Sequence, residues 1–199
     1  MATSGNNPRG FVPTRHLRGD VNFRTRIYKT NSGNLAQIYP GDLVFLDAAG
    51  RPQLTTGATL ASTSPVGVVC AVYDGNGKPR THSLPSGGAF AAVSADANIA
   101  IWDDPDIIYT VQCDTSVGPG SIGNYIAVTA NAPSTAASRS RQLVAFAELT
   151  VSALGHPLQI IGIAPNELDA VGGANNDIEV IISNHLYRRM PLTPNTPAV

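Results

Sequence analysis

The chain has 199 residues, enough to form one domain that removes roughly 70% of its unfolded surface from water. Charged residues make up 14% of the sequence and the formal net charge is −1, which argues against an intrinsically disordered chain and against a dedicated nucleic-acid-binding protein. The 19 glycines and 15 prolines indicate many turns and few helices.

Residues 1–30 are predicted to form an extended basic N-terminal arm. They contain six of the 13 basic residues against a single acid, for a local net charge of +5. Residues 31–138 carry three basic and eight acidic residues, for a local net charge of −5. A basic arm of this kind could pair with its own body, with a neighbouring copy, or with a separate acidic surface.

Apolar side chains are interleaved with the basic ones in this arm, which favours docking against protein over binding of nucleic acid. Arg18-Gly19-Asp20 matches a cell-adhesion tripeptide, but Gly-Asp is ordinary turn chemistry, so we interpret the match as a turn. The residues expected to make the docking contacts are Arg9, Phe11, Arg15, Leu17, Arg18, Phe23, Arg24 and Arg26.

Residues 31–187 are expected to form a β-rich body. The runs at 42–46 and 66–73 are rich in Val, Leu, Phe and Tyr, are bounded by turn-forming residues, and are too short for helices. Further strands are expected at 81–85, 89–93, 97–102, 107–113, 124–129, 142–151, 158–163 and 177–183. Residues 188–199 are expected to form a Pro-rich tail, because prolines cannot donate hydrogen bonds inside a sheet.

Two segments of the body partly match ligand-binding motifs. Asp103, Asp104 and Asp106 could bind a hard cation such as Ca²⁺, but the spacing of a calcium loop is missing and Asp-Pro commonly begins a turn. Residues 118–123 satisfy G-x-G-x-x-G, yet a β-like run follows them where a dinucleotide site needs a helix. We therefore expect a loop between strands at 118–123.

The sequence gives little support for catalysis or for a bound metal. His16, His82, His156 and His185 lie far apart, and none has a second histidine or cysteine at metal-ligand spacing. No nucleophile elbow or phosphate-binding loop occurs. We expect a protein that is not an enzyme and that has no cofactor and no metal.

The two cysteines and the N-terminus bear on the cellular compartment. Cys70 and Cys113 lie in apolar runs and are expected to be free thiols. The first residues contain no apolar leader segment, and no window reaches the ~18 apolar residues of a membrane span. We expect no membrane partner, and assembly in a reducing cytoplasm.

Several longer segments, in their order along the chain, resemble a family of tailed-bacteriophage capsid decoration (cement) or minor head structural proteins. They are NNPRGFVPTRHLRG, IYPGDLVFLDAAGRP, SPVGVVCAVYDGNGKP, IAIWDDPDIIYTVQCD and IIGIAPNELDAVGGANNDIEVIISNHLY. The resemblance spans most of residues 7–187, and its more specific parts are WDDPD and EVIISNHLY.

The resemblance implies an all-β fold, with a β-barrel or β-tulip-like body and an extended N-terminal arm. It also implies a homotrimer at the three-fold positions of the shell, bound to the major capsid protein on the capsid exterior of the virion. Such a protein stabilises the head by bridging capsomers. The arm would clamp it onto the shell or a neighbouring copy, and deletion of residues 1–30 would leave a folded body that no longer binds capsids.

Two other functions stay open from the sequence. A receptor-binding or glycan-binding module on the virion surface would need exposed aromatic side chains, and Trp102, the only tryptophan, lies where a strand core is expected. A β-rich enzyme or assembly factor that leaves before maturation would be absent from finished particles.

Overall fold

The computed structural model describes residues 8–19, 22–30, 38–55, 64–74, 77–79, 97–129, 140, 142–151, 156–164 and 175–188. In these ranges the chain is all-β, with eleven strands and one short 3-10 helix, η2 (Pro119–Ser121). The strands are β1 (Val12–His16), β2 (Thr25–Thr30), β3 (Leu43–Leu46), β4 (Pro52–Leu54), β5 (Pro65–Tyr73), β6 (Ala97–Trp102), β7 (Ile107–Gln112), β8 (Tyr125–Thr129), β9 (Leu143–Thr150), β10 (Leu158–Ile163) and β11 (Asp177–Ile182).

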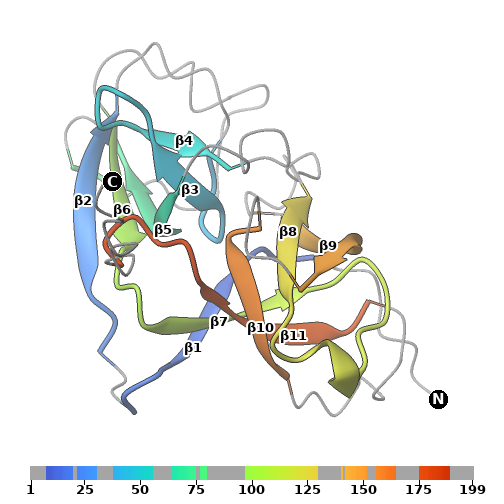
Figure 1. Ribbon diagram of the computed structural model, residues 1–199. Coiled ribbons are helices and arrows are strands. Elements are labelled where there is room, and N and C mark those ends of the chain that lie inside the picture. The colour runs from blue at the N-terminus through green and yellow to red at the C-terminus, as the bar shows by residue number, and fades with distance from the viewer. Residues whose placement is uncertain are drawn as a thin grey trace, which may run out of the picture.

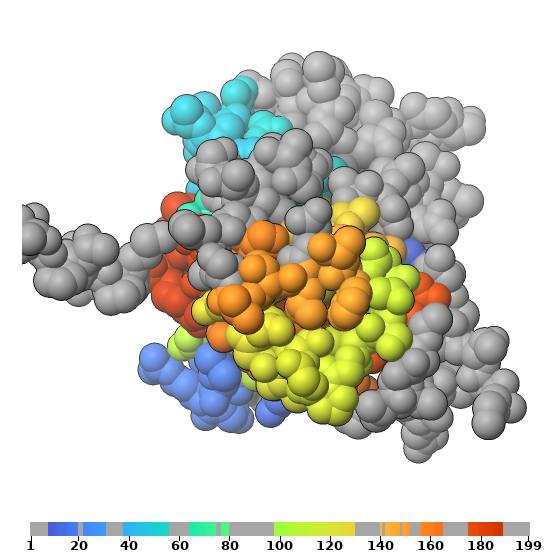
Figure 2. All heavy atoms as spheres, turned by 45° about the vertical axis from the view of Figure 1, so that its right-hand side comes forward, coloured from blue at the N-terminus to red at the C-terminus, as the bar shows by residue number. Residues whose placement is uncertain are grey.

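The strands form two antiparallel sheets, which lie side by side in Figure 1. The six-stranded sheet has the order β1-β7-β11-β10-β8-β9, and the five-stranded sheet has the order β2-β6-β5-β3-β4. Figure 2 shows the face of the six-stranded sheet on which β9 and β10, in orange, lie beside the segment between β7 and β8, in lime to yellow. The expected all-β class is confirmed, but the sheets do not close into a barrel.

The connection between β1 and β2 and the connection between β6 and β7 both pass from one sheet to the other. β6 and β7 are consecutive strands of different sheets, joined only by the turn Asp103–Asp106. β1 pairs with β7 and β2 pairs with β6, both antiparallel, so β1 and β2 run in the opposite direction along β7 and β6. The described parts of the two connections, residues 17–19 and 22–24 and residues 103–106, therefore meet at the same place.

The residues expected to form a separate arm thus include two strands of the sheets. β2 keeps an unbroken register with β6, from Thr25 opposite Trp102 to Thr30 opposite Ala97. The boundary expected at residue 30 does not separate a free segment from the sheets in this structure. Sequence pattern missed β1, β2 and the short β4.

The core explains why the apolar runs became strands. One cluster of buried side chains joins residues of both sheets, among them Leu43, Val68, Tyr109 and Leu158. A second cluster, which includes Val44, Val69, Val72, Ile99 and Ile101, contains residues of the five-stranded sheet together with Ile38, which precedes β3. The expected strands at 42–46, 66–73, 97–102, 107–113, 124–129, 142–151, 158–163 and 177–183 are confirmed to within one or two residues at their ends. Those at 81–85 and 89–93, and the tail beyond residue 188, lie outside the described residues.

A buried polar cluster joins the start of β3 to the start of β9. The side chain of Gln142 accepts a hydrogen bond from the backbone N–H of Leu43 at 2.6 Å and donates one to the carbonyl of Thr55 at 2.9 Å. Asp42, 3% exposed, accepts a hydrogen bond from the backbone N–H of Tyr39 at 2.7 Å and is also hydrogen-bonded to Ser140. Burial raises the pKa of Asp42 to about 6, although both hydrogen bonds act in the opposite direction.

One glycine allows β5 to lie close to β6. Gly67 has φ +149°, a backbone conformation that L residues rarely adopt, and a Cβ there would overlap the carbonyl oxygen of Trp102.

In the described residues, 118–123 form a loop with η2 and lead directly into β8, so this stretch has no helix of the kind that a dinucleotide site needs. Cys70 and Cys113 are free thiols.

Candidate functional site

The candidate site is the place where the two connections meet, which we call the crossing. It comprises residues 16–19 and 22–26 of the N-terminal segment and the turn Asp103–Asp106. Leu17 is fixed to the turn by a backbone hydrogen bond to the carbonyl of Asp106 at 2.9 Å. The most basic part of the sequence therefore lies on its most acidic turn.

Asp103 is at the centre of the crossing and is fully buried. Its Oδ1 accepts a hydrogen bond from Nε of Arg24 at 2.9 Å, and the Nη2 of the same guanidinium donates to the Asp103 carbonyl at 2.9 Å. Its Oδ2 pairs with Nε of Arg26 at 3.2 Å and accepts the hydroxyl of Tyr28 at 2.9 Å. Both carboxylate oxygens are thus paired, as a buried charge requires.

This environment shifts the pKa of the groups around Asp103. The Asp103 carboxylate is the largest cause of the raised pKa of Arg26. Burial is the largest cause of the raised pKa of Tyr28, and its hydrogen bonds with Tyr187 and Asp103 act in the same direction. Arg26 is therefore charged and Tyr28 is a neutral donor throughout the physiological pH range.

The segment after β11 covers this network. The hydroxyl groups of Tyr187 and Tyr28 are 3.0 Å apart, and the guanidinium of Arg26 lies 5.3 Å from the centroid of the Tyr187 ring. Next to it, His185 is 2% exposed, and its Nδ1 accepts the backbone N–H of Tyr187 at 3.1 Å. Burial lowers the pKa of His185 to about 4. The segment carries a neutral histidine beside a charged network.

The other two carboxylates of the turn have partners of their own. Asp104 lies 3.3 Å from Nε2 of His16, and Asp106 pairs with Arg18 at 3.2 Å and Arg188 at 3.4 Å. Nδ1 of His16 accepts the backbone N–H of Arg18, so in neutral His16 the proton is on Nε2, toward Asp104.

These contacts bear on the hypothesis of a cation site in the turn. His16, Asp104 and Asp106 are close enough together to hold a metal ion, but Asp103 is not part of that group. Asp106 is already neutralised by two arginines, and a bound cation would be repelled by both. The three aspartates expected as possible Ca²⁺ ligands therefore do not converge on one point.

Two more arginines of the N-terminal segment pair with β11. Arg9 contacts Asp177 at 2.9 Å and Arg15 contacts Glu179 at 2.7 Å. Across all five ion pairs of Arg9, Arg15, Arg18, Arg24 and Arg26 with carboxylates, the arginine side chains are 48% to 82% exposed and the carboxylates at most 24%. The acids form an inner layer and the guanidinium groups an outer, solvent-facing layer.

The remaining residues expected to make docking contacts divide into two kinds. Phe11 is 1% exposed and packs edge-on against Tyr109, and Phe23 is partly buried against the core, so both belong to the interior of this chain. Leu17 is 53% exposed. Of the eight residues expected to make docking contacts, the arginines and Leu17 are therefore the ones that lie at the surface.

Several residues of the site were not expected from the sequence. Tyr28, Tyr187 and the β11 acids Asp177 and Glu179 carry contacts that were not foreseen. The opposite local charges of residues 1–30 and 31–138 were the available signal, and self-pairing was one of three possibilities that this signal left open. Trp102 packs against the core, as its position in an apolar run indicated.

No family model, curated protein or solved structure matches this chain. Among the described residues, no helix has the length and hydropathy of a membrane span.

Proposed function

We propose that this chain is a capsid decoration (cement) protein that binds the outer surface of a tailed-bacteriophage head. It acts without a chemical reaction, by bridging neighbouring subunits of the major capsid protein. The virion is its site of action, after assembly in the host cytoplasm, and it acts there as a homotrimer.

One observation carries this proposal, namely the outer layer of guanidinium groups over an inner layer of carboxylates. Arg9, Arg15 and Arg18 are held in place by their acids and still face the solvent. Side chains that are already ordered lose less conformational entropy on binding than free ones do. Each guanidinium carries five N–H donors, so a second carboxylate can bind while the first is retained. Such a surface suits an acidic protein surface, and exposed Leu17 adds an apolar contact.

An oligomer with several copies of this surface would bind a shell tightly even if each contact is weak. Linking binding sites raises the overall affinity by ~10²–10⁴ where the geometry allows simultaneous contact. A protein that contacts two capsomers at once resists their separation, which is the mechanical role that we propose.

Point substitutions test this proposal better than deletion of residues 1–30. That deletion would remove β1 and β2 from the sheets and leave the buried carboxylate of Asp103 without Arg24 and Arg26. We therefore expect the truncated chain to lose its fold as well as any binding.

The test is a quantitative gel of purified particles from the phage that encodes this chain. A resident decoration protein is present in a simple ratio to the major capsid protein, and its absence from finished particles would contradict the proposal. Leu17→Asp should then reduce rebinding to particles that lack the chain. Ile122→Asp is the matched control, because Ile122 is similarly exposed at 48% but lies between η2 and β8, a strand that three others separate from β1 in the six-stranded sheet.

A further inference from the structure

We propose that the outer edge of β2 binds an extended, acidic segment of a partner protein, which adds to the five-stranded sheet as a further strand. The inference rests on the proposed function, because it names the chemistry of the partner that the shell would provide.

The four edge strands differ in whether another strand can pair with them. β1 contains Pro13, which has no N–H, and its register with β7 shifts between Pro13 and Arg15. β4 has three residues and begins with Pro52. β9 is contacted by the segment after β7, through the bridge of Cys113 with Val144 and the hydrogen bond from Asp114 N–H to the Val144 carbonyl.

β2 has none of these features, although β4, the other edge strand of its sheet, approaches it without pairing with it. It has six residues, no proline and an unbroken register with β6. In an antiparallel pair, alternate residues point their N–H and C=O groups away from the neighbouring strand. Within the described ranges, no segment pairs with the outer side of β2, which lies along the margin of the sheet in Figure 1. The edge can therefore accept main-chain hydrogen bonds from an added strand.

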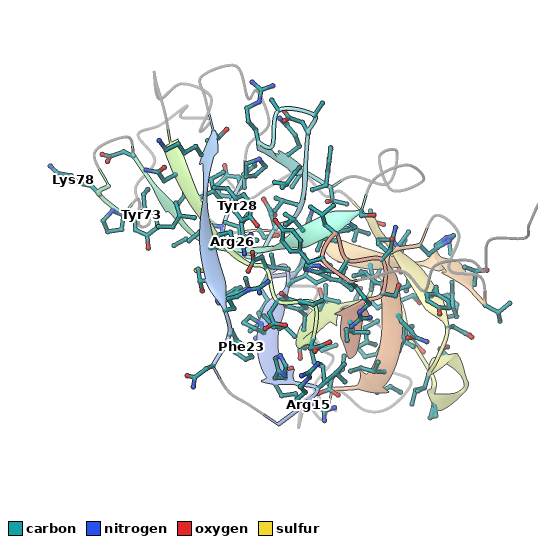
Figure 3. All side chains as sticks on the ribbon, turned by 60° about the vertical axis from the view of Figure 1, so that its left-hand side comes forward. Arg15, Phe23, Arg26, Tyr28, Tyr73 and Lys78 are labelled. Atoms are coloured by element: carbon teal, nitrogen blue, oxygen red, sulfur yellow. The ribbon has the colours of Figure 1, made fainter. Side chains whose placement is uncertain are left out.

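The side chains of β2 indicate what that strand should contain. Side chains alternate between the two faces, so Arg26 and Tyr28 lie on one face and Ile27 and Lys29 on the other. Figure 3 shows Arg26 and Tyr28 beside the β2 ribbon. Ile27 is 62% exposed, and its cross-strand neighbour on β6 is the small Ala100. An added strand would place an apolar side chain beside Ile27 and acidic ones beside Arg26 and Lys29.

Charge selects an acidic partner over a second copy of this chain. Residues 22–30 contain Arg24, Arg26 and Lys29 and no acid. The acid that neutralises Arg24 and Arg26 is Asp103, which is fully buried and so presents no negative charge at the surface. Two β2 strands placed edge to edge would bring like charges together, which destabilises a pair of strands.

The test uses a synthetic peptide of about eight residues, long enough to pair with β2, with Val at the position opposite Ile27 and Asp or Glu at the positions opposite Arg26 and Lys29. Its binding to the full chain is measured by fluorescence anisotropy, and hydrogen exchange of the amides of residues 25–29 is measured with and without it. We expect a Kd below about 1 mM and slower exchange of these amides. A peptide of the same sequence with alternate backbone nitrogens methylated cannot pair as a strand, so it should not bind.

Charge reversal supplies a matched pair of variants, since the chain has only two lysines. Lys29→Glu should weaken peptide binding about three- to tenfold. Lys78→Glu should leave it unchanged, because Lys78 lies beyond Tyr73 on the side away from Arg26 and Tyr28 (Figure 3). Binding of the methylated peptide, equal loss in both variants, or no binding at about 1 mM would overturn the proposal.

The two proposals fail in different ways. If particles bind the chain and Lys29→Glu has no effect on that binding or on the peptide, the β2 edge is not the contact and the proposed function stands. If the peptide binds β2 and the chain is absent from particles, the edge is a binding site and the proposed function is wrong.

Discussion

Asp103 accepts a hydrogen bond from Nε of Arg24 at 2.9 Å, although the two residues are 79 positions apart in the sequence. The carboxylate is fully buried and the arginine side chain is 48% exposed. This pair joins the N-terminal segment to the turn between β6 and β7, where the chain passes from one sheet to the other.

Because only the acid is buried, the two sides of this ion pair should respond differently to substitution. Asp103→Asn leaves Arg24 and Arg26 free to be solvated. Arg24→Ala combined with Arg26→Ala instead leaves a buried carboxylate without a cation, which costs about 3–5 kcal/mol of unfolding free energy. We expect the arginine double variant to be less stable than Asp103→Asn in urea denaturation.

The triple variant, with all three substitutions, is the control for this prediction. It contains no uncompensated buried charge, so it should be more stable than the arginine double variant. Equal stability of the two would mean that Asp103 does not need its arginines.

His185 should make the protein less stable in mild acid. Its pKa in the fold is about 4 because of burial, against 6.5 for an ordinary histidine, so the unfolded chain takes up the proton first. The stabilising contribution of neutral His185 is complete above pH 6.5 and is lost as the pH falls through 4, with an upper limit of about 3 kcal/mol. His185→Asn keeps an acceptor for the Tyr187 N–H and does not titrate.

Urea unfolding of the original protein and of His185→Asn between pH 7 and pH 4 tests this prediction for His185. The free energy of unfolding of the original protein should fall relative to that of His185→Asn over this range. A constant difference between the two would show that His185 does not resist protonation in the fold.

Asp42 should have the opposite pH dependence. Its pKa is about 6 in the fold and 3.8 in the unfolded chain, so the fold favours the protonated form. The contribution of Asp42 to stability is therefore complete below pH 3.8 and is lost as the pH rises through 6, by about 3 kcal/mol. Relative to Asp42→Asn, the original protein should become less stable from pH 4 to pH 7. The same urea series measures this, and a trend of the opposite sign would show that Asp42 is stabilised as a carboxylate.

Gly67 should not tolerate a side chain. Ala at this position would have a strained φ, and its Cβ would meet the backbone of Trp102 in β6, which cannot move as a flexible side chain can. We expect Gly67→Ala to lower the free energy of unfolding by at least about 2 kcal/mol. Gly50→Ala is the comparison, because Gly50 also has positive φ but its Cβ would meet no atom within 4 Å. Equal losses in both variants would assign the effect to φ alone.

Local pattern was enough to predict most of the body. The runs that became β3, β5, β6 and β10 are apolar, short and bounded by turn residues, and each of these strands packs side chains into a buried cluster. β1 and β2 carry exposed arginines and a proline, so their hydrophobic pattern is weak. They are strands because they pair with β7 and β6, and partners that are 67 to 98 residues away leave no local trace.

The candidate site was predictable in composition and not in geometry. Clustered arginines and the Asp103–Asp106 turn are both evident in the sequence, yet net charge cannot decide between pairing within the chain and pairing with another protein. Pairing within the chain results from the fold, in which the N-terminal segment and the Asp103–Asp106 turn pass from one sheet to the other at the same place. Phe11 illustrates the same limit, because it lies between the exposed residues Arg9 and Val12 while its own ring packs against Tyr109 in the core.

The most direct test of the cement function is the temperature at which heated phage particles release their DNA, measured with and without this chain bound. We predict that particles lacking the chain release DNA at a lower temperature, and that adding the purified chain back restores the original value. Release at the same temperature, with the chain shown by gel to be bound at full copy number, would contradict a mechanical role.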